Sequence, residues 1–185
     1  MLEIDITPNE FTMVFYDAAV IAEVAAEVAG KVGFPEGTPI SLVVDEEMPL
    51  GRSKVTSYDP VEFTVDGGAF EDSRRPRNMS KSRTSDVLGR LMLRVMDRTS
   101  GKFDDAPADD EIDLALHAAW DAHSVGRLER LGFASQRKRR IYQFRNRHGF
   151  TDRADQAFDE LWGSNELAWA DIERISTDCR AAFSG

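Results

Sequence analysis

The hydrophobic residues at the start of the chain change from strand spacing to helix spacing. Residues 2–6 alternate apolar and polar side chains, which predicts a half-buried strand. From Phe11 to Val32 the apolar residues recur every three or four positions, the period of one helix face. Thr7-Pro8-Asn9-Glu10 combines an N-cap residue, a proline and a glutamate in the manner of a capping box. We therefore expect a long helix that begins near Pro8 and ends before Gly33.

The middle of the chain has the composition of strands and loops. Three segments rich in β-branched residues, 40–47, 53–58 and 61–65, predict strands. Asp66-Gly67-Gly68 then marks a turn. Residues 71–85 contain almost no apolar side chains, so we expect an exposed loop that is mobile or covered by a partner.

The rest of the chain has helical spacing. Helices are expected over about 85–98, within 111–133, over about 151–162 with Thr151 as N-cap, and over about 165–183. These elements predict an α+β fold with a small early sheet, a long N-terminal helix and a mainly helical C-terminal half. We expect a single domain, 1–185, made of a sheet-containing part (1–70), a basic loop (71–85) and a helical part (86–185).

The composition excludes several classes of protein. No stretch is apolar enough to span a membrane, and the one cysteine, Cys179, cannot form an internal disulfide. The acidic start of the chain differs from a secretory signal, which needs basic residues and then an apolar run. We therefore expect a cytoplasmic protein.

The formal net charge of −10 is unevenly distributed along the chain. Residues 1–73 hold 3 basic and 15 acidic side chains, residues 74–147 hold 17 and 10, and residues 148–185 hold 3 and 8. The basic middle either pairs with the acidic ends within the fold or faces an acidic or phosphate-bearing partner.

Two arginine-rich segments and the helix between them provide the candidate binding residues. The first segment precedes a helix whose N-terminal amides could hold an anion. The second interleaves cations with aromatic residues, as a site for phosphates and stacked bases requires, and as an amphipathic helix with arginine stems on the core also does. The candidates are Arg74, Arg75, Arg77, Arg83, Arg90, Arg94, Arg137, Lys138, Arg139, Arg140, Arg145 and Arg147.

Catalytic and metal-binding residues are scarce in the sequence. Asp113, His117 and Asp121 recur every four residues on one helix face, where they could hold a cation or form a solvated surface. Cys179 lies on an apolar helix stripe, which predicts a buried thiol with a raised pKa. We expect no catalytic residue, no metal and no cofactor.

The order helix, SLVVDEEMPLG, VEFTVDGGAFED and helix DVLGRLMLRVMDR resembles the minimal zincin-like metallopeptidase domains of bacteria, over about residues 8–100. The resemblance implies that the zinc motif H-E-x-x-H falls on Arg90-Leu91-Met92-Leu93-Arg94, where both metal-binding histidines are replaced by arginines. Guanidinium groups repel a cation, so no peptidase activity is expected. Arg90 and Arg94 could instead bind an anion or pair with the acidic residues 45–47.

Three hypotheses of function follow. The first is a non-catalytic protein that binds an acidic protein partner, or a second copy of itself, through its arginine-rich middle. The second is a nucleic-acid or phosphate-binding protein that uses residues 74–83 and 137–147. The third is an enzyme with an atypical site around Asp113, His117 and Asp121.

Overall fold

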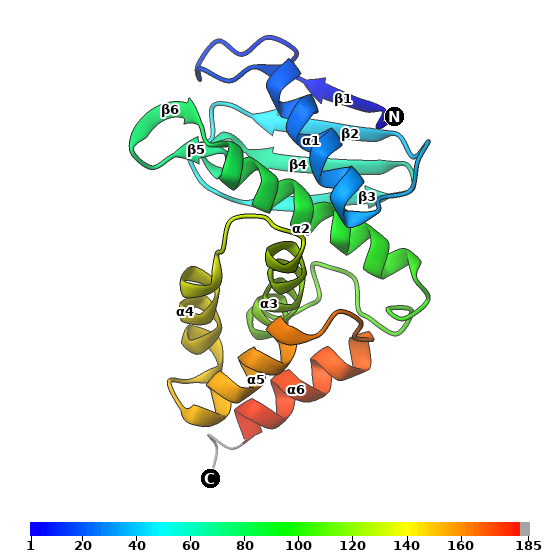
Figure 1. The fold of residues 1–185 in the computed structure, drawn as a ribbon, viewed down its shortest axis with the longest axis vertical. Helices are drawn as coiled ribbons and strands as arrows, with labels where there is room; N and C mark the ends of the chain where they lie inside the picture. Colours follow the sequence, from blue (N-terminus) through cyan, green and yellow to red (C-terminus); the bar gives the residue numbers. More distant parts are fainter. Residues whose placement is uncertain (182–185) are drawn as a thin grey trace. The chain divides into compact units, whose positions relative to one another are not determined.

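The chain combines a mixed sheet with six helices, which confirms the predicted α+β class. A computed structural model describes residues 1–181. Its strands are β1 (Ile4–Thr7), β2 (Ile40–Asp45), β3 (Ser53–Tyr58), β4 (Val61–Asp66), β5 (Glu71–Asp72) and β6 (Arg75–Met79). Its helices are α1 (Ala18–Val32), α2 (Lys81–Thr99), α3 (Leu114–Arg130), α4 (Arg137–His148), α5 (Asp152–Gly163) and α6 (Trp169–Ala181). Figure 1 shows these elements in chain order.

The chain folds as two compact units. The first covers Met1–Met96 and the second begins at Asp97, so helix α2 belongs to the first unit except for its last three residues. The grouping of both units into one domain stays a prediction.

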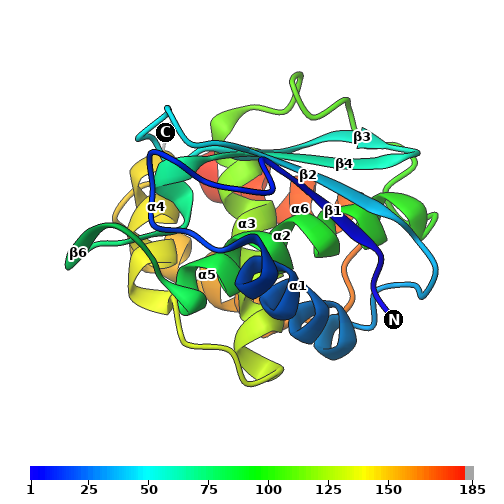
Figure 2. The same ribbon diagram turned by 90° about the horizontal axis from the view of Figure 1, so that it is seen from above.

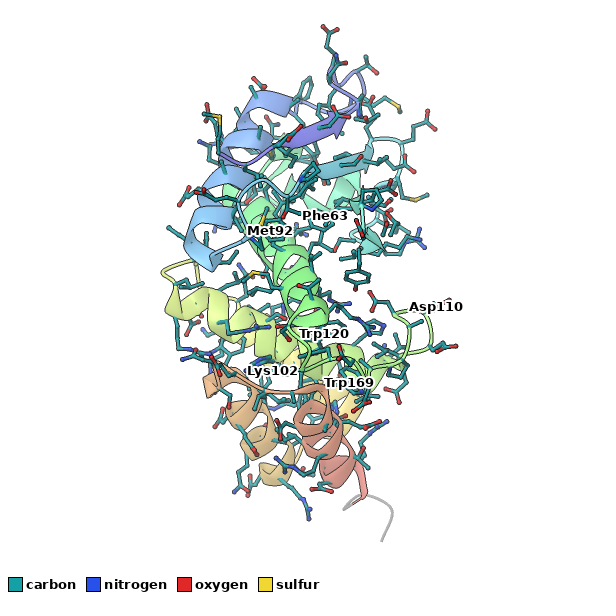
Figure 3. All side chains as sticks on the ribbon, turned by 90° about the vertical axis from the view of Figure 1, so that its right-hand side faces the viewer. Phe63, Met92, Lys102, Asp110, Trp120 and Trp169 are labelled. Atoms are coloured by element: carbon teal, nitrogen blue, oxygen red, sulfur yellow. The ribbon has the colours of Figure 1, made fainter. Side chains whose placement is uncertain are left out.

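The first unit is built on a four-stranded sheet with the strand order β1-β2-β4-β3. Strands β1, β2 and β4 are parallel, whereas β3 is antiparallel to β4. Helices α1 and α2 lie against the same face of this sheet (Figures 1 and 2). Alternate strand residues such as Leu42 and Phe63 are buried on that face, as the period of two requires, while Val43 and Glu62 are exposed. Figure 3 shows Phe63 and Met92, both fully buried, in the first unit.

The prediction that the first helix begins near Pro8 is wrong, because α1 begins ten residues later, at Ala18. Thr7, the expected N-cap, pairs with Val43 in the sheet. The side chain of Asp17 caps the helix instead by accepting a hydrogen bond from the amide of Ala19, at 2.8 Å. Between them, the amides of Thr12 and Met13 donate to Glu46 and the amide of Phe15 donates to Arg77, so these amides do not form helical hydrogen bonds.

The predicted loop 71–85 is also wrong, because these residues form a hairpin and the start of α2. Strands β5 and β6 pair antiparallel, and α2 begins at Lys81. The amide of Ser80 donates to the carbonyl of Phe70 (2.8 Å), which closes the base of the hairpin. Polar side chains gave no strand signal here, since backbone pairing holds the hairpin together.

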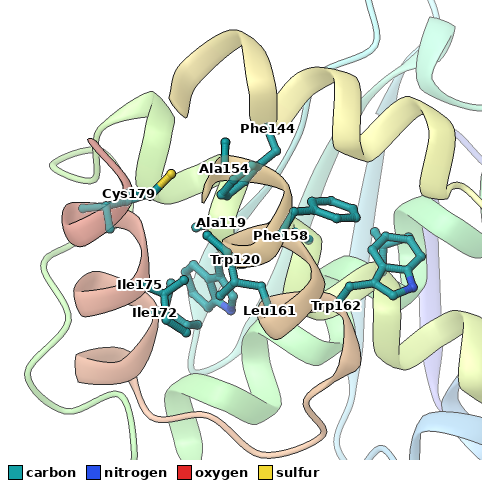
Figure 4. Close-up of a cluster of buried hydrophobic side chains, with 14 of the residues drawn as sticks. Ala119, Trp120, Phe144, Ala154, Phe158, Leu161, Trp162, Ile172, Ile175 and Cys179 are labelled. Carbon is teal, nitrogen blue, oxygen red and sulfur yellow. The ribbon is translucent and has the colours of Figure 1, made fainter. Parts of the chain in front are cut away.

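The second unit is a group of helices around an aromatic core. Trp120, Trp162 and Trp169 are buried, and Figure 4 shows two of them with Phe144 and Phe158 between the helices. Thr151 caps α5, as predicted, by accepting from the amide of Ala154 at 3.1 Å. Helix α6 begins at Trp169, and the last two residues of the predicted helix 165–183 lie outside the described residues.

Within residues 1–181, no helix is both long and apolar enough to cross a membrane.

Candidate functional site

Three of the candidate arginines on α4 are neutralised inside the second unit. Arg140 is buried and donates to Asp121 on α3 (3.4 Å), and Arg145 makes a bidentate pair with Asp155 on α5, at 2.7 Å for both bonds. Arg137 pairs with Asp159 and lies over the rings of Phe158 and Trp162. These three side chains join α4 to its neighbours and so stabilise the fold.

The candidate arginines on α2 also have contacts within the first unit. Arg83 donates to the backbone carbonyl of Glu71 at 2.8 Å, and Arg90 pairs with Asp86 one helical turn earlier at 3.2 Å. Arg94 is half-buried on the same helix. Leu91, at the position of the zincin glutamate, is buried in the core. The zincin resemblance stays a prediction.

Arg74, Arg75 and Arg77 are exposed on the hairpin formed by β5 and β6, which we call the arginine hairpin (Glu71–Met79). Among the described residues, no carboxylate pairs with the guanidinium group of any of the three. The two acidic residues of the hairpin bind its backbone instead. Glu71 accepts from the amide of Arg77 and Asp72 from the amide of Arg74, each at 2.9 Å. The hairpin therefore presents three cations that the fold does not neutralise.

Phe15 lies beside the arginine hairpin. Its amide donates to the carbonyl of Arg77 (2.8 Å), and it forms a parallel bridge with Asn78. The ring of Phe15 is 71% exposed, an unusual state for so large an apolar side chain. Figure 2 shows the hairpin projecting from its unit. Phe15 meets the hairpin at Arg77, and Arg74 and Arg75 precede Arg77 by three and two residues on the same hairpin. We call these four residues, Phe15, Arg74, Arg75 and Arg77, the hairpin site.

Glu46 holds the segment that carries Phe15. One oxygen of its carboxylate accepts from the amides of Thr12 (2.9 Å) and Met13 (2.7 Å), and the other accepts from the hydroxyl of Thr12. The hydrogen bond from the Met13 amide lowers the pKa of Glu46 below its ordinary value. Glu46 is therefore ionised at neutral pH and positions Phe15 from the β2–β3 loop.

Tyr16 anchors the other side of Phe15. Its hydroxyl donates to the carbonyl of Gly67 at 2.6 Å, and its ring is buried near Phe11 and Phe70. Burial raises the pKa of Tyr16 to about 12, so the hydroxyl stays protonated and remains a donor. With Tyr16 buried, its neighbour Phe15 is directed away from the core.

Helix α4 presents a second exposed set of cations and rings. Lys138, Arg139 and Arg147 are exposed, as are Tyr142 and Phe150, whose rings are in edge contact with centroids 6.1 Å apart. In the part of the chain that the structure describes, no carboxylate pairs with Lys138 or Arg147. Some cations of α4, such as Arg140, thus stabilise the fold, whereas others, such as Lys138 and Arg147, are exposed on the surface.

The column Asp113, His117 and Asp121 is engaged in other contacts. Asp113 caps α3 and pairs with Arg180, His117 lies 3.0 Å from the carbonyl of Asp109, and Asp121 pairs with Arg140. No group of three or more potential ligands within residues 1–181 is placed to hold a metal ion.

Cys179 and the buried histidines are parts of the core of the second unit. Cys179 is buried, and this burial raises the pKa of its thiol, as predicted. His148 is stacked on Phe144 and lies 2.8 Å from the hydroxyl of Ser176, which is itself fully buried. Both side chains therefore pack within the second unit.

Comparison with known protein families, with curated proteins and with solved structures gives no match to this chain.

Sequence reasoning identified the three hairpin arginines but missed Phe15 and Glu46. The spacing of Phe15 predicts a helix face, and Glu46 is one of three consecutive acidic residues with nothing in the sequence to distinguish it. Their roles depend on contacts between segments more than thirty residues apart, which only the fold reveals.

Proposed function

We propose that this chain is a non-catalytic binding protein that holds an acidic protein segment at the hairpin site. The observation that carries the proposal is that Arg74, Arg75 and Arg77 are exposed beside Phe15 while most of the other candidate arginines have partners inside the fold. Guanidinium groups bind carboxylates through paired, charge-assisted hydrogen bonds.

The chemistry of the hairpin site favours a protein segment that is both acidic and apolar. Three cations suit a small number of carboxylates, and the ring of Phe15 gains free energy when an apolar side chain covers it. The first unit holds 10 basic and 16 acidic residues over 1–96, so the three exposed arginines form a local cationic patch on a unit with net negative charge. A second copy of the chain is itself an acidic protein, because residues 1–73 hold 15 acidic and 3 basic side chains.

A titration monitored by fluorescence anisotropy tests the proposal. The probe is a fluorescein-labelled peptide rich in aspartate and leucine, and its counterpart with asparagine in place of aspartate is the control probe. We expect saturable binding of the acidic peptide only. The triple variant Arg74→Ser/Arg75→Ser/Arg77→Ser should bind at least about tenfold more weakly, which corresponds to about 1.4 kcal/mol.

The matched control variant is Lys138→Ser/Arg147→Ser, which removes exposed cations from α4 and should leave peptide affinity unchanged. Equal affinity of the triple variant and the natural chain would refute the proposal. Sedimentation velocity of both proteins over a range of concentrations shows whether the partner is a second copy: association that the triple variant loses identifies the chain as its own partner.

A further inference from the structure

Helix α4 has an excess of positive charge that its surroundings only partly neutralise. Its 12 residues, Arg137–His148, include six lysines and arginines and no acidic residue. Asp121, Asp155 and Asp159 of the neighbouring helices pair with three of them. Of the others, Lys138 and Arg147 are exposed, and no carboxylate within residues 1–181 pairs with either of them.

Two exposed aromatic rings lie among these cations. Tyr142 is 59% exposed and Phe150 is 63% exposed, and their rings meet at an interplanar angle of 70°. Lys138 and Tyr142 are four residues apart and thus occupy one row on the helix surface. Phe150 follows the glycine that ends the helix. In the unit where this pair lies, the three tryptophans are buried, so exposure is not a general property of its aromatic residues.

We propose that the exposed side of α4, with Lys138 and Arg147 at its two opposite edges and Tyr142 between them, forms together with Phe150 a binding site for single-stranded nucleic acid. Such ligands combine planar bases, which stack on aromatic rings, with phosphates, which bind lysine and arginine. Every nucleotide of such a strand brings both a phosphate and a planar base, whereas a protein segment brings an acidic and an aromatic side chain only where its sequence contains both. The hairpin site differs from the α4 face because it has a single exposed aromatic residue.

The test is a titration of the full chain with fluorescein-labelled oligothymidylate and oligouridylate at about 50 mM salt, followed by anisotropy. We expect saturable binding to at least one oligonucleotide. With two phosphates neutralised, affinity should fall about sevenfold when the salt concentration is raised fourfold. The variant Tyr142→Ala/Phe150→Ala should bind at least about tenfold more weakly. Both side chains are exposed, and tryptophan fluorescence checks that the variant is folded.

Matched variants make the result specific to the α4 face. Phe15→Ala removes an equally exposed ring from the first unit and should leave oligonucleotide affinity unchanged, as should Arg74→Ser/Arg75→Ser/Arg77→Ser. Absence of saturable binding to both oligonucleotides, or equal affinity of the double ring variant and the natural chain, would overturn the inference. Binding of the aspartate-rich peptide that depends on Lys138 and Arg147 would overturn it in favour of an acidic protein ligand. None of these outcomes depends on the hairpin site.

Discussion

Replacing Arg140 or Arg147 by methionine tests whether some cations of α4 stabilise the fold while others lie exposed on the surface and do not. Arg140 is 5% exposed, and its guanidinium donates to Asp121 (3.4 Å) and to Gln143 (3.1 Å). Methionine keeps most of the packing of the aliphatic stem but removes the charge. Arg147 is exposed on the same helix and provides the matched control.

Arg140→Met should lower the free energy of unfolding because the carboxylate of Asp121 loses the guanidinium group of Arg140. Breaking a fully buried ion pair by removing one partner costs about 3–5 kcal/mol. The side chain of Asp121 keeps 20% of its exposure and can be partly rehydrated, so we expect a loss of about 2 kcal/mol. This corresponds to a decrease in Tm of about 4–8 °C. Arg147→Met should change the free energy of unfolding by less than about 0.5 kcal/mol.

Urea unfolding followed by tryptophan fluorescence measures this difference. All three tryptophans lie in the second unit, so the signal reports the part of the chain that contains α4. In the double variant Arg140→Met/Asp121→Asn the carboxylate that Arg140 neutralises is absent, and part of the lost stability should return. Equal unfolding midpoints for Arg140→Met and Arg147→Met would refute the division of the α4 cations.

Three further predictions concern packing, protonation and the position of Phe15. A Cβ atom on Gly126 would lie 2.2 Å from the carbonyl oxygen of Trp162, so Gly126→Ala should lower the free energy of unfolding, measured by urea titration, by about 2 kcal/mol or more. A Cβ atom on Gly163 would lie in open space, so the control Gly163→Ala should cause no such loss. Burial lowers the pKa of His123 from its ordinary 6.5 to about 4. The neutral imidazole therefore contributes its full stability above pH 6.5, and this stability is lost as the pH falls from 6.5 toward 4. His123→Gln should remove about 3 kcal/mol of the pH dependence of the free energy of unfolding. An unchanged pH dependence in that variant would contradict the assignment. Glu46→Gln should accelerate hydrogen exchange at the amides of residues 12 and 13, and the adjacent control Glu47→Gln should leave it unchanged; equal exchange rates in both variants would show that Glu46 does not hold this segment.

The sequence predicted the elements whose signals are local. The alternation of apolar and polar residues over 61–65 predicts the burial of one face of β4. Thr151 indicates where α5 begins, because its side chain accepts a hydrogen bond from an amide three residues away. Phe11 and Phe15 have helical spacing, yet long-range hydrogen bonds to Glu46 and Arg77 hold the segment between them outside the helix. The spacing of apolar side chains along the chain does not predict such hydrogen bonds.

The division of the arginines is likewise a property of tertiary structure. Arg137 and Lys138 are neighbours with similar chemistry, and only the position of α5 relative to α4 gives the first of them a carboxylate partner, Asp159. In the same way, the charge count of residues 74–147 gave no sign that Arg75 is exposed while Arg83 is bound to a backbone carbonyl. The sequence thus identified the cationic segments but could not separate surface from interior.

We propose that the exposed arginines of the hairpin, together with Phe15, hold an acidic protein segment. The most direct measurement is a titration of the isotope-labelled chain with the aspartate-rich peptide, followed by NMR of the backbone amides and the arginine Nε–H groups. We predict shifts concentrated at Phe15 and at residues 71–79, including the Nε–H groups of Arg74, Arg75 and Arg77. Shifts confined to other residues, or no shifts at saturating peptide, would contradict the claim.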